Sequence, residues 1–596
     1  MIEETIRPDT DPDPGEARVV ETDVLVVGTG PAGATCALAL ATYGVRVLAV
    51  TQWNWLANSP RAHITNQRAM EVLRDLGVED EVLRAGTPWE LMGDMTFAYS
   101  LAGTEVARLR TWGTGDDRAT DYRTASPCPL VDLPQPEMEP ILVTNAAARG
   151  AQLLFNTEYL SHVQDDDGVT ARLRSKLDGS ILTVRCRYLV GADGARSRIA
   201  EQIGLPIEGT MGRAGTVYAR FRADLTDLVR DRPSILHRIL VPAYGEIGMR
   251  TLRVVRPWTE WIAGWGYALD GPAPDLSHET ARARIAEMVG SPDVEVCVDD
   301  VTAWQVNQAW ATEYSRGRVF CAGDAVHRHP PSSGLGSNTS IQDSFNLAWK
   351  LAYAVRGWAG PELLDSYTPE RAPVGRQIVE RANQSRHDYA ELNELLSAGP
   401  DGSRPLIELV DEASEDGARV RSALAAAVAR KNFEFNAEGV EMNQRYTSGA
   451  VVPDLGEPEA WPRDRTLYHQ PSARPGARLP HAWLVGRDGR RVSTLDLVGH
   501  GRFTLVTGLA GTAWVEAVAA LDLPFLHSLV IGSADAQDLY FEWTRLRGGP
   551  EGAAILTRPD GFVAWRCDTS GLTPAAATGE LTAALGQVLG RELVRG

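Results

Sequence analysis

The sequence contains few lysines and few cysteines. Only three of its 59 basic residues are lysines, and 78 acidic residues bring the net charge to −19. Nucleic acids and anionic membranes bind basic surfaces, so we expect neither as a partner. The six cysteines are scattered, with no CxxC pair and no metal-ligand cluster. This pattern predicts free thiols, a reducing compartment and therefore a cytoplasmic protein.

Long apolar runs are also missing. No stretch approaches the roughly 18 apolar residues that cross a membrane. Residues 1–20 are acidic and contain proline, unlike a secretory signal, so we expect a disordered arm. The remaining chain is long enough for two to four domains with separate cores.

A strand, a glycine-rich turn and a helix are predicted between residues 23 and 43. The apolar run 24–27 suits a buried parallel strand, and an alanine-rich helical pattern follows. The glycines between them have GxGxxG spacing, which permits a tight turn, close approach of a pyrophosphate and close packing of helix on strand. The predicted cofactor-binding residues of this turn are Gly28, Gly30, Pro31, Ala32 and Gly33.

The next predicted strand, 45–50, ends without the carboxylate that usually binds the adenosine ribose. Thr51 stands there instead, and its hydroxyl can offer only a neutral hydrogen bond. Recognition of the ribose must be weaker here or come from elsewhere. This departure leaves open whether the dinucleotide is FAD or NAD.

A second strand–glycine–helix unit lies between residues 317 and 355. The apolar run 319–322 stops at Gly323-Asp324, a loop rich in glycine and serine follows, and residues 339–355 have helical periodicity. The carboxylate of Asp324 would face a polyol, and the loop amides would face an oxyanion. Another predicted strand, 182–190, ends in Gly191-Ala192-Asp193-Gly194.

The rest of the chain predicts two helices, an aromatic sheet and a small α/β unit. Residues 70–77 form an amphipathic helix preceded by Arg61 and His63, and Gln135 opens a helix over 135–148. β-Formers alternate with tryptophan and tyrosine over 213–270. Residues from about 450 onward alternate strands with an alanine-rich helix.

With GxGxxG, Asp193-Gly194 and Gly323-Asp324 in this order, the chain resembles the class A flavoprotein aromatic monooxygenases. The stretches 61–77 and 327–350 are most similar to the phenol hydroxylase branch. The resemblance implies an α/β fold: a Rossmann-like FAD-binding domain, a β-sheet substrate domain and a C-terminal thioredoxin-like domain. The expected divisions are an arm (1–20), FAD-binding parts (21–95, 128–200, 301–395), substrate-domain parts (96–127, 201–300), a helical linker (396–449) and the C-terminal domain (450–596).

The resemblance also implies FAD as cofactor, with NADPH or NADH as a transient reductant. It assigns Arg61 and Gln135 to the pyrophosphate and ribityl region and Asp324 to a ribityl hydroxyl. It places Asp193 in a motif shared by FAD and nicotinamide binding. The further cofactor-binding residues are Gly323, Pro331, Gly336, Ser337 and Asn338, with the last three facing the flavin ring.

Three positions depart from the family pattern. Thr51 replaces the ribose carboxylate, Ala200 stands where arginine is common, and the loop 334–338 lacks the usual Gln and Met. The C-terminal domain has no CxxC, so it cannot be a dithiol redox centre. We expect it to serve packing or association of identical subunits.

The expected reaction is hydroxylation of a phenol-like or hydroxylated heteroaromatic ring, ortho to a hydroxyl group, with O2 and through a flavin hydroperoxide. Matching the family places His63 where a carboxylate takes the phenol proton, and a neutral imidazole can do this at pH 7. Tyr218, His237 and Tyr244 in the aromatic sheet are candidate substrate-binding residues. The alternatives are a FAD-dependent dehydrogenase and a FAD-stabilised protein without catalysis; the WxWxIP motif of flavin halogenases is absent.

Overall fold

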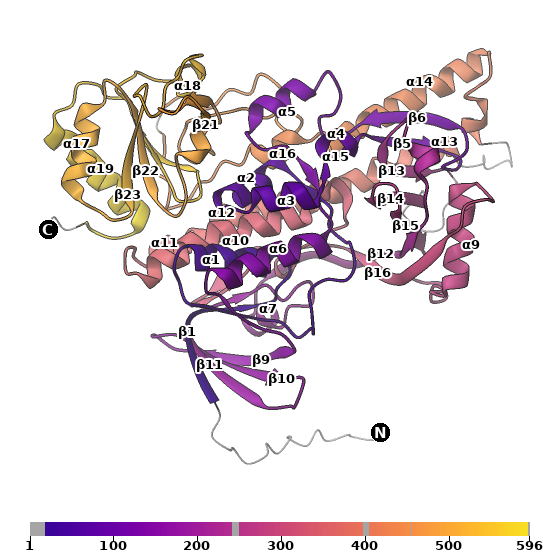
Figure 1. The fold of residues 1–596 in the computed structure, drawn as a ribbon, viewed down its shortest axis with the longest axis horizontal. Coiled ribbons are helices and arrows are strands. Elements are labelled where there is room, and N and C mark those ends of the chain that lie inside the picture. Colours follow the sequence, from indigo (N-terminus) through magenta and orange to yellow (C-terminus); the bar gives the residue numbers. More distant parts are fainter. Residues whose placement is uncertain (1–17, 241–249, 397–404, 455, 594–596) are drawn as a thin grey trace.

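The computed structural model describes residues 18–240, 250–396, 405–454 and 456–593. Two large sheets and a separate C-terminal sheet are joined by long central helices (Figure 1). The predicted α/β organisation is confirmed. Among the described helices, none combines the length and the apolar character needed to cross a membrane.

The first sheet carries the glycine-rich turns. Its strand order is β17-β18-β11-β1-β2-β8, and β9 and β10 extend it beside β11. The strands are β1 (Arg18–Val27), β2 (Val47–Val50), β8 (Gln152–Leu154), β9 (Thr157–Gln164), β10 (Val169–Ser175), β11 (Ile181–Gly191), β17 (Ser315–Arg316) and β18 (Val319–Cys321). The central strands β1, β2, β11 and β18 run parallel. Because a parallel sheet is covered on both faces, the paired segments 24–27, 47–50, 188–190 and 319–321 of these strands are apolar.

Helices α1 (Pro31–Thr42), α6 (Gln135–Ala148) and α10 (Gly336–Val355) belong to the same body. All but three residues of α10 are buried, which places it in the centre of the molecule. Strand β1 starts at Arg18, so the end of the predicted 1–20 arm is strand. Residues 1–17 lie outside the described residues.

The second sheet has the order β19-β16-β12-β15-β14-β13-β5-β6. Its strands are β5 (Asp94–Ala98), β6 (Glu105–Arg110), β12 (Ile207–Arg222), β13 (Ser234–Ile239), β14 (Arg250–Arg256), β15 (Glu260–Tyr267), β16 (Cys297–Ala311) and β19 (His327–Arg328). One face packs its apolar side chains with helix α9 (His278–Val289) in a shared core. Since side chains alternate along a strand, the intervening residues occupy the opposite face.

A three-stranded sheet joins these two bodies. It consists of β3 (Ile64–Thr65), β7 (Val131–Asp132) and β4 (Thr87–Pro88), with β7 in the middle. The remaining helices of the first half of the chain are α2 (Gln67–Asp75), α3 (Glu79–Ala85), α4 (Trp89–Met92), α5 (Ala119–Ala125), α7 (Arg198–Gln202) and α8 (Thr226–Val229).

The helices after α10 lead to the C-terminal domain. They are α11 (Glu362–Asp365), α12 (Tyr367–His387), α13 (Ala390–Leu396), α14 (Glu415–Arg430), α15 (Asn432–Phe435) and α16 (Glu438–Met442). This series covers much of the predicted helical linker, and its residues 397–404 lie outside the described residues.

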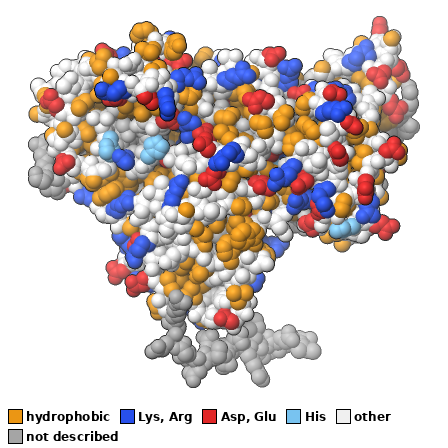
Figure 2. Space-filling view, viewed as in Figure 1, with side chains coloured by type: hydrophobic (Ala, Val, Ile, Leu, Met, Phe, Trp, Pro, Cys, Tyr) orange, Lys and Arg blue, Asp and Glu red, His pale blue; other side chains and the backbone are white. Residues whose placement is uncertain are grey.

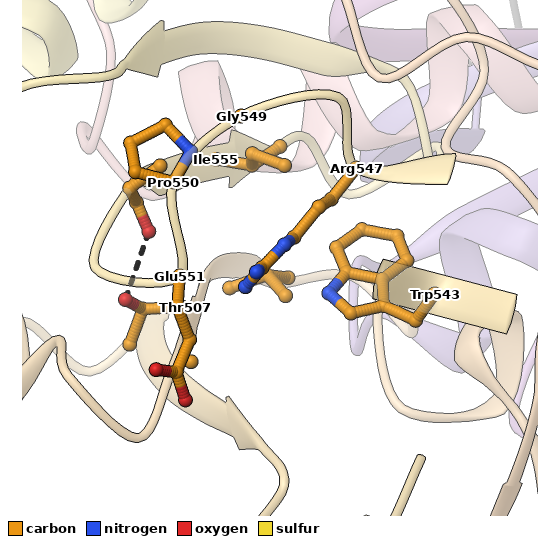
Figure 3. Close-up of a pocket in the computed structure, with 10 residues that line it drawn as sticks. Thr507, Trp543, Arg547, Gly549, Pro550, Glu551 and Ile555 are labelled. Carbon is orange, nitrogen blue, oxygen red and sulfur yellow. Dashed lines mark hydrogen bonds between the residues drawn. The ribbon is translucent and has the colours of Figure 1, made fainter. Parts of the chain in front are cut away.

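The C-terminal sheet has the order β23-β22-β24-β25, with β22 and β23 parallel and the other pairs antiparallel. The elements of the C-terminal domain are β20 (Trp483–Val485), β21 (Arg491–Ser493), β22 (Phe503–Gly508), α17 (Thr512–Leu521), β23 (Leu526–Ile531), α18 (Glu542–Leu546), β24 (Ala554–Thr557), β25 (Val563–Cys567) and α19 (Pro574–Leu589). A βαβ unit followed by two antiparallel strands and a helix is the thioredoxin-like arrangement that we predicted. The cavity beside Trp543 and Arg547 in this domain has a volume of about 10 Å³, room for roughly one water molecule (Figure 3).

Candidate active site

The GxGxxG turn lies between β1 and α1, and glycine suits its three positions for different structural reasons. A Cβ on Gly28 would lie 2.0 Å from the carbonyl oxygen of Ala192, and a Cβ on Gly33 would lie 1.9 Å from that of Gly28. Packing therefore requires both glycines. A Cβ on Gly30 would meet only a carboxylate oxygen of Glu139, at 3.8 Å. The space above Gly30 is open to a ligand, as a pyrophosphate at a helix N-terminus needs.

The N-terminus of α1 adds to this site. Gly30 is the N-cap, and Pro31 occupies the first helical position, where its missing N–H costs no hydrogen bond. The carbonyl of Ala32 in the first turn accepts a hydrogen bond from the hydroxyl of Ser344 on α10. This contact brings the two predicted nucleotide-binding units together.

The second unit meets the first at Gly323. A Cβ on this residue would lie 2.9 Å from the Ser340 hydroxyl and 3.0 Å from the Ala32 side chain, and its φ of +66° suits glycine. Its N–H donates to the buried carboxylate of Asp343. The next residue, Asp324, is exposed, as a ligand for sugar hydroxyls must be.

The loop before α10 presents backbone amides. Gly336, Ser337 and Asn338 form the first turn of α10, where N–H groups have no carbonyl partner within the helix. The Asn338 side chain donates to the carbonyls of Ile64 and Gly334 and accepts from the N–H of Asn66. The helix start is thereby fixed beside β3. Pro331, at the start of this loop, is exposed.

Arg61 and Gln135 lie beside the same turn, near Glu139. The Gln135 amide donates to Glu139 at 2.6 Å, and Arg61 acts to lower the raised pKa of this mostly buried carboxyl. Glu139 borders Gly30, so Gln135 and Arg61 are linked to the open space above the turn through this carboxylate. Arg61 itself is exposed.

Two further predicted cofactor residues are engaged within the protein. The Thr51 hydroxyl is buried and accepts from the N–H of Trp53 at 3.5 Å. The Asp193 carboxylate accepts from the Ser197 hydroxyl at 2.6 Å and from the N–H of Arg198 at 2.9 Å. Asp193 therefore fixes the start of α7, and burial raises its pKa.

His63 lies just before β3, with its ring buried against β7. Its Nδ1 atom is 3.3 Å from the Oδ1 atom of Asp132. Burial lowers the pKa of His63 and the charge of Arg253 lowers it further, although Asp132 acts in the opposite direction. The imidazole is therefore neutral at pH 7. Both ring nitrogens are buried, and within the described residues neither makes a well-formed hydrogen bond.

The carboxylate beside His63 is itself held in place. A terminal guanidinium nitrogen of Arg253, which lies on β14 of the second sheet, is 3.1 Å from the Oδ2 atom of Asp132. Burial acts to raise the pKa of Asp132, but Arg253 and His63 outweigh burial and the pKa is lowered. Asp132 is therefore charged and can orient the imidazole. Sequence reasoning missed both residues, and the only local signal was the position of Asp132 in a short apolar stretch.

The structure places two of the three aromatic-sheet candidates, and they lie on opposite faces. Tyr218 lies on the same face of the second sheet as Arg253. Burial raises the pKa of Tyr218, although the charges of Arg238 and Arg253 act in the opposite direction. His237 lies on the other face: it bonds to the Thr96 hydroxyl at 2.8 Å and packs against Trp261 in the α9 core. The structure does not bring His237 to His63. Tyr244 lies outside the described residues.

Together these residues fit FAD. An open glycine turn, the N-terminus of α1 packed against α10 and an exposed carboxylate after the second turn match a dinucleotide with a pyrophosphate and a polyol. Among the described residues, no group of three potential metal ligands converges. Arginines and acidic residues are mixed across the face shown in Figure 2.

Comparison with known proteins agrees with this geometry. Residues 21–382 match the model of a FAD binding domain, and residues 472–592 match that of the aromatic-ring hydroxylase C-terminal domain. The chain is 47% identical to 2,4-dichlorophenol 6-monooxygenase of Cupriavidus pinatubonensis, covering 97% of this chain and 98% of that protein. It is 45% identical to phenol 2-monooxygenase of a Pseudomonas species, covering 95% and 93%.

A solved structure is similar over the same length. The flavin-dependent monooxygenase PieE, crystallised with FAD and substrate, superposes with a TM-score of 0.91 at 43% identity, covering 96% of this chain and all of the other. The similarity thus extends through both sheets and the C-terminal domain.

Proposed function

This chain belongs to the FAD-dependent aromatic-ring hydroxylases, and from that membership we propose that it hydroxylates a phenol beside the existing hydroxyl group. It is a flavoprotein monooxygenase that uses O2 and a nicotinamide nucleotide. The observation that carries the proposed substrate class is the similarity to two phenol-acting enzymes over nearly the whole length of each chain.

We assign the cofactor contacts from the geometry. Gly30 and the N-terminus of α1 would take the pyrophosphate, with Arg61 and Gln135 beside it, and Asp324 would take a ribityl hydroxyl. The N–H groups of Gly336, Ser337 and Asn338 would stabilise negative charge on the flavin ring. When bound and reduced, FAD supplies the activation of O2. Asp193 would act indirectly by fixing α7, and Pro331 would shape the loop before α10.

We assign the role of proton acceptor to His63. A phenol with a pKa near 10, like tyrosine, is about three units from ionisation at pH 7, which corresponds to roughly 4 kcal/mol. A ring is attacked more readily as phenolate, so a base that takes the proton removes much of this barrier. The buried imidazole is neutral at pH 7, and Asp132 holds Nδ1, which leaves Nε2 for the phenol.

Tyr218 is the proposed substrate contact on the sheet. It shares its face with Arg253, which orients Asp132, so a ring bound between them would lie near His63. His237 is on the opposite face and would act only by supporting the sheet.

We retain three further parts of the proposal. We keep the domain divisions predicted above as part of the proposal, with the substrate domain extended through β16. The six cysteines, all free thiols, favour the cytoplasm as the compartment.

Exposed Leu539, Tyr540 and Phe541 in the C-terminal domain offer an apolar surface for association of two copies.

Oxygen consumption tests this function. Purified protein with FAD is mixed with NADPH or NADH and a panel of phenols, and O2 uptake, nucleotide oxidation and catechol formation are measured. We expect one catechol per nucleotide oxidised with the best phenol. Substrate oxidation without O2 incorporation would identify a dehydrogenase. FAD binding without ring-dependent nucleotide oxidation would favour a non-catalytic binding protein.

A further inference from the structure

Two exposed tryptophans follow directly after β2. Trp53 and Trp55 each have 62% of their surface exposed, in a segment of residues 52–58 that we call the indole loop. Single exposed apolar residues are common, but two exposed indoles two residues apart are an unusual apolar surface. The proposed reaction gives them no role.

The indole loop is fixed to the FAD-binding body at three points. The carbonyl of Trp53 accepts from the N–H of Asn156 at 2.9 Å, and the N–H of Ala57 donates to Glu139 at 2.7 Å. The indole of Trp55 stacks on Phe155 with ring centroids 5.4 Å apart and an angle of 22°. Trp55 therefore has one supported face and remains largely exposed. A surface held in this way loses little entropy when a flat ligand binds.

The position of the loop relates it to the dinucleotide. In a Rossmann-like domain, the residue at the end of the second strand binds the adenosine ribose with a carboxylate. Here that residue is Thr51, whose hydroxyl is already bonded to Trp53. Glu139, which holds Ala57, also borders the open space above Gly30. The indole loop thus lies between the ribose position and the pyrophosphate turn.

We propose that the adenine ring of FAD stacks on the indole loop, with Trp55 as the main contact, and that this stacking replaces the missing ribose carboxylate. The inference rests on the proposed binding of FAD. Every purine has a flat π face that stacks on an aromatic side chain without a specific hydrogen-bond pattern. The Lys176 ammonium lies over the Trp53 ring, 5.6 Å from its centroid, and so occupies one face of that indole, which leaves Trp55 as the main contact.

The occupant is the adenine of FAD rather than that of the nicotinamide nucleotide. The chain has one GxGxxG turn, and the strand that ends at Thr51 pairs directly with the strand that leads into this turn. One dinucleotide therefore takes both the turn and the strand end.

The test compares FAD with FMN, which lacks the adenosine half. Dissociation constants for the apo-protein are measured by flavin fluorescence for wild type, Trp53→Leu, Trp55→Leu and Trp55→Phe. We expect Trp55→Leu to weaken FAD about tenfold, in the range for loss of one base-stacking contact. FMN binding should not change, and Trp55→Phe should recover most of the FAD affinity. The control is Tyr99→Leu, an exposed aromatic beside the second sheet, which should alter neither constant.

Three results would overturn the inference. Unchanged FAD affinity in both leucine variants removes the stacking contact. Equal weakening of FAD and FMN shows that the loop supports the fold rather than the adenine. A raised KM for NADPH with unchanged FAD affinity assigns the indoles to the nicotinamide nucleotide. Failure of the wild-type apo-protein to bind FAD would instead refute the proposed function, because the stacking comparison starts from wild-type binding.

Discussion

The Nδ1 atom of His63 lies 3.3 Å from the Oδ1 atom of Asp132, although 69 positions separate the two residues in the chain. The contact forms because β3 and β7 pair antiparallel, with Ile64 opposite Asp132. On its other side, the carboxylate meets Arg253 from the second sheet. The proposed base is therefore held where the FAD-binding body and the second sheet meet.

Replacing His63 by alanine should leave FAD affinity intact and slow hydroxylation by about 10²–10⁴, the usual contribution of a general base. The rate should recover partly as pH rises toward the pKa of the phenol, because the substrate then ionises without help. Single-turnover product formation measures this. The control is His527→Ala, an exposed histidine on β23. Wild-type rates in His63→Ala would end the assignment.

Asp132→Asn should move the acid limb of the pH profile of kcat/KM to lower pH. Asp132 raises the pKa of His63, against burial and Arg253, so its removal lowers that pKa further. His63 accepts a proton only when neutral, so activity is lost as pH falls through this pKa. In the variant, the loss should begin at lower pH, and Asp132→Glu should restore the original limb. A profile that falls in height without moving would mean that Asp132 is only structural.

Gly30→Ala should weaken FAD binding at least tenfold without destabilising the apo-protein, an effect of about 1.4 kcal/mol. The added methyl group meets only Glu139 at 3.8 Å, so it projects into the space assigned to the pyrophosphate. Equilibrium titration and thermal unfolding of apo-protein are the measurements. Gly449→Ala, where a Cβ meets nothing within 4 Å, is the matched control. Normal FAD affinity in Gly30→Ala would place the pyrophosphate elsewhere.

Asp324→Ala should also weaken FAD, roughly tenfold or more, because a hydrogen bond to a charged group contributes about 1.5–3 kcal/mol. The side chain is exposed, so the apo-protein should unfold at an unchanged temperature. Asp227→Ala, an 85% exposed aspartate on α8, controls for loss of surface charge. An unchanged FAD dissociation constant would remove Asp324 from the site.

Arg558→Met should destabilise the protein by about 3–5 kcal/mol, the cost of leaving buried charges unpaired. Arg558 enters from the C-terminal domain and binds Glu370 at 2.5 Å and Asp560 at 2.5 Å, all nearly inaccessible to solvent. Lys350 of α10 binds the same Glu370 at 2.8 Å. Adding Asp560→Asn leaves the Lys350–Glu370 pair balanced, so the double variant should unfold at a higher temperature than Arg558→Met. The reverse order would show that the two partners are not energetically linked.

The same contacts define what the C-terminal domain does. Arg558 and Asp560 reach α10 and α12 of the FAD-binding body. The domain therefore contributes to the packing of the FAD-binding body, one of the two roles expected from its lack of a CxxC pair.

The sequence alone determined the elements whose signals are local. The helix predicted over 135–148 is α6 with the same bounds, and the predicted 339–355 helix is α10 with one further turn before it. Glycine spacing identified both turns, since a strand stop, a positive φ and a helix start are properties of adjacent residues. The small C-terminal α/β unit also followed from consecutive strands and a helix, whereas its thioredoxin-like character came from the family resemblance.

Only the tertiary structure decided which distant side chains meet. Asp132 and Arg253 are 121 positions apart and are joined by the packing of two sheets, which no local period encodes. Side chains alternate between the two faces of a strand, so the sequence shows that Tyr218 and its direct neighbours point to opposite faces. Packing against α9 decides which of the two faces becomes core. His237 therefore looked as suitable as Tyr218 in the sequence and lies on the other side of the sheet. Burial, which makes His63 neutral at pH 7, is likewise a property of the whole fold.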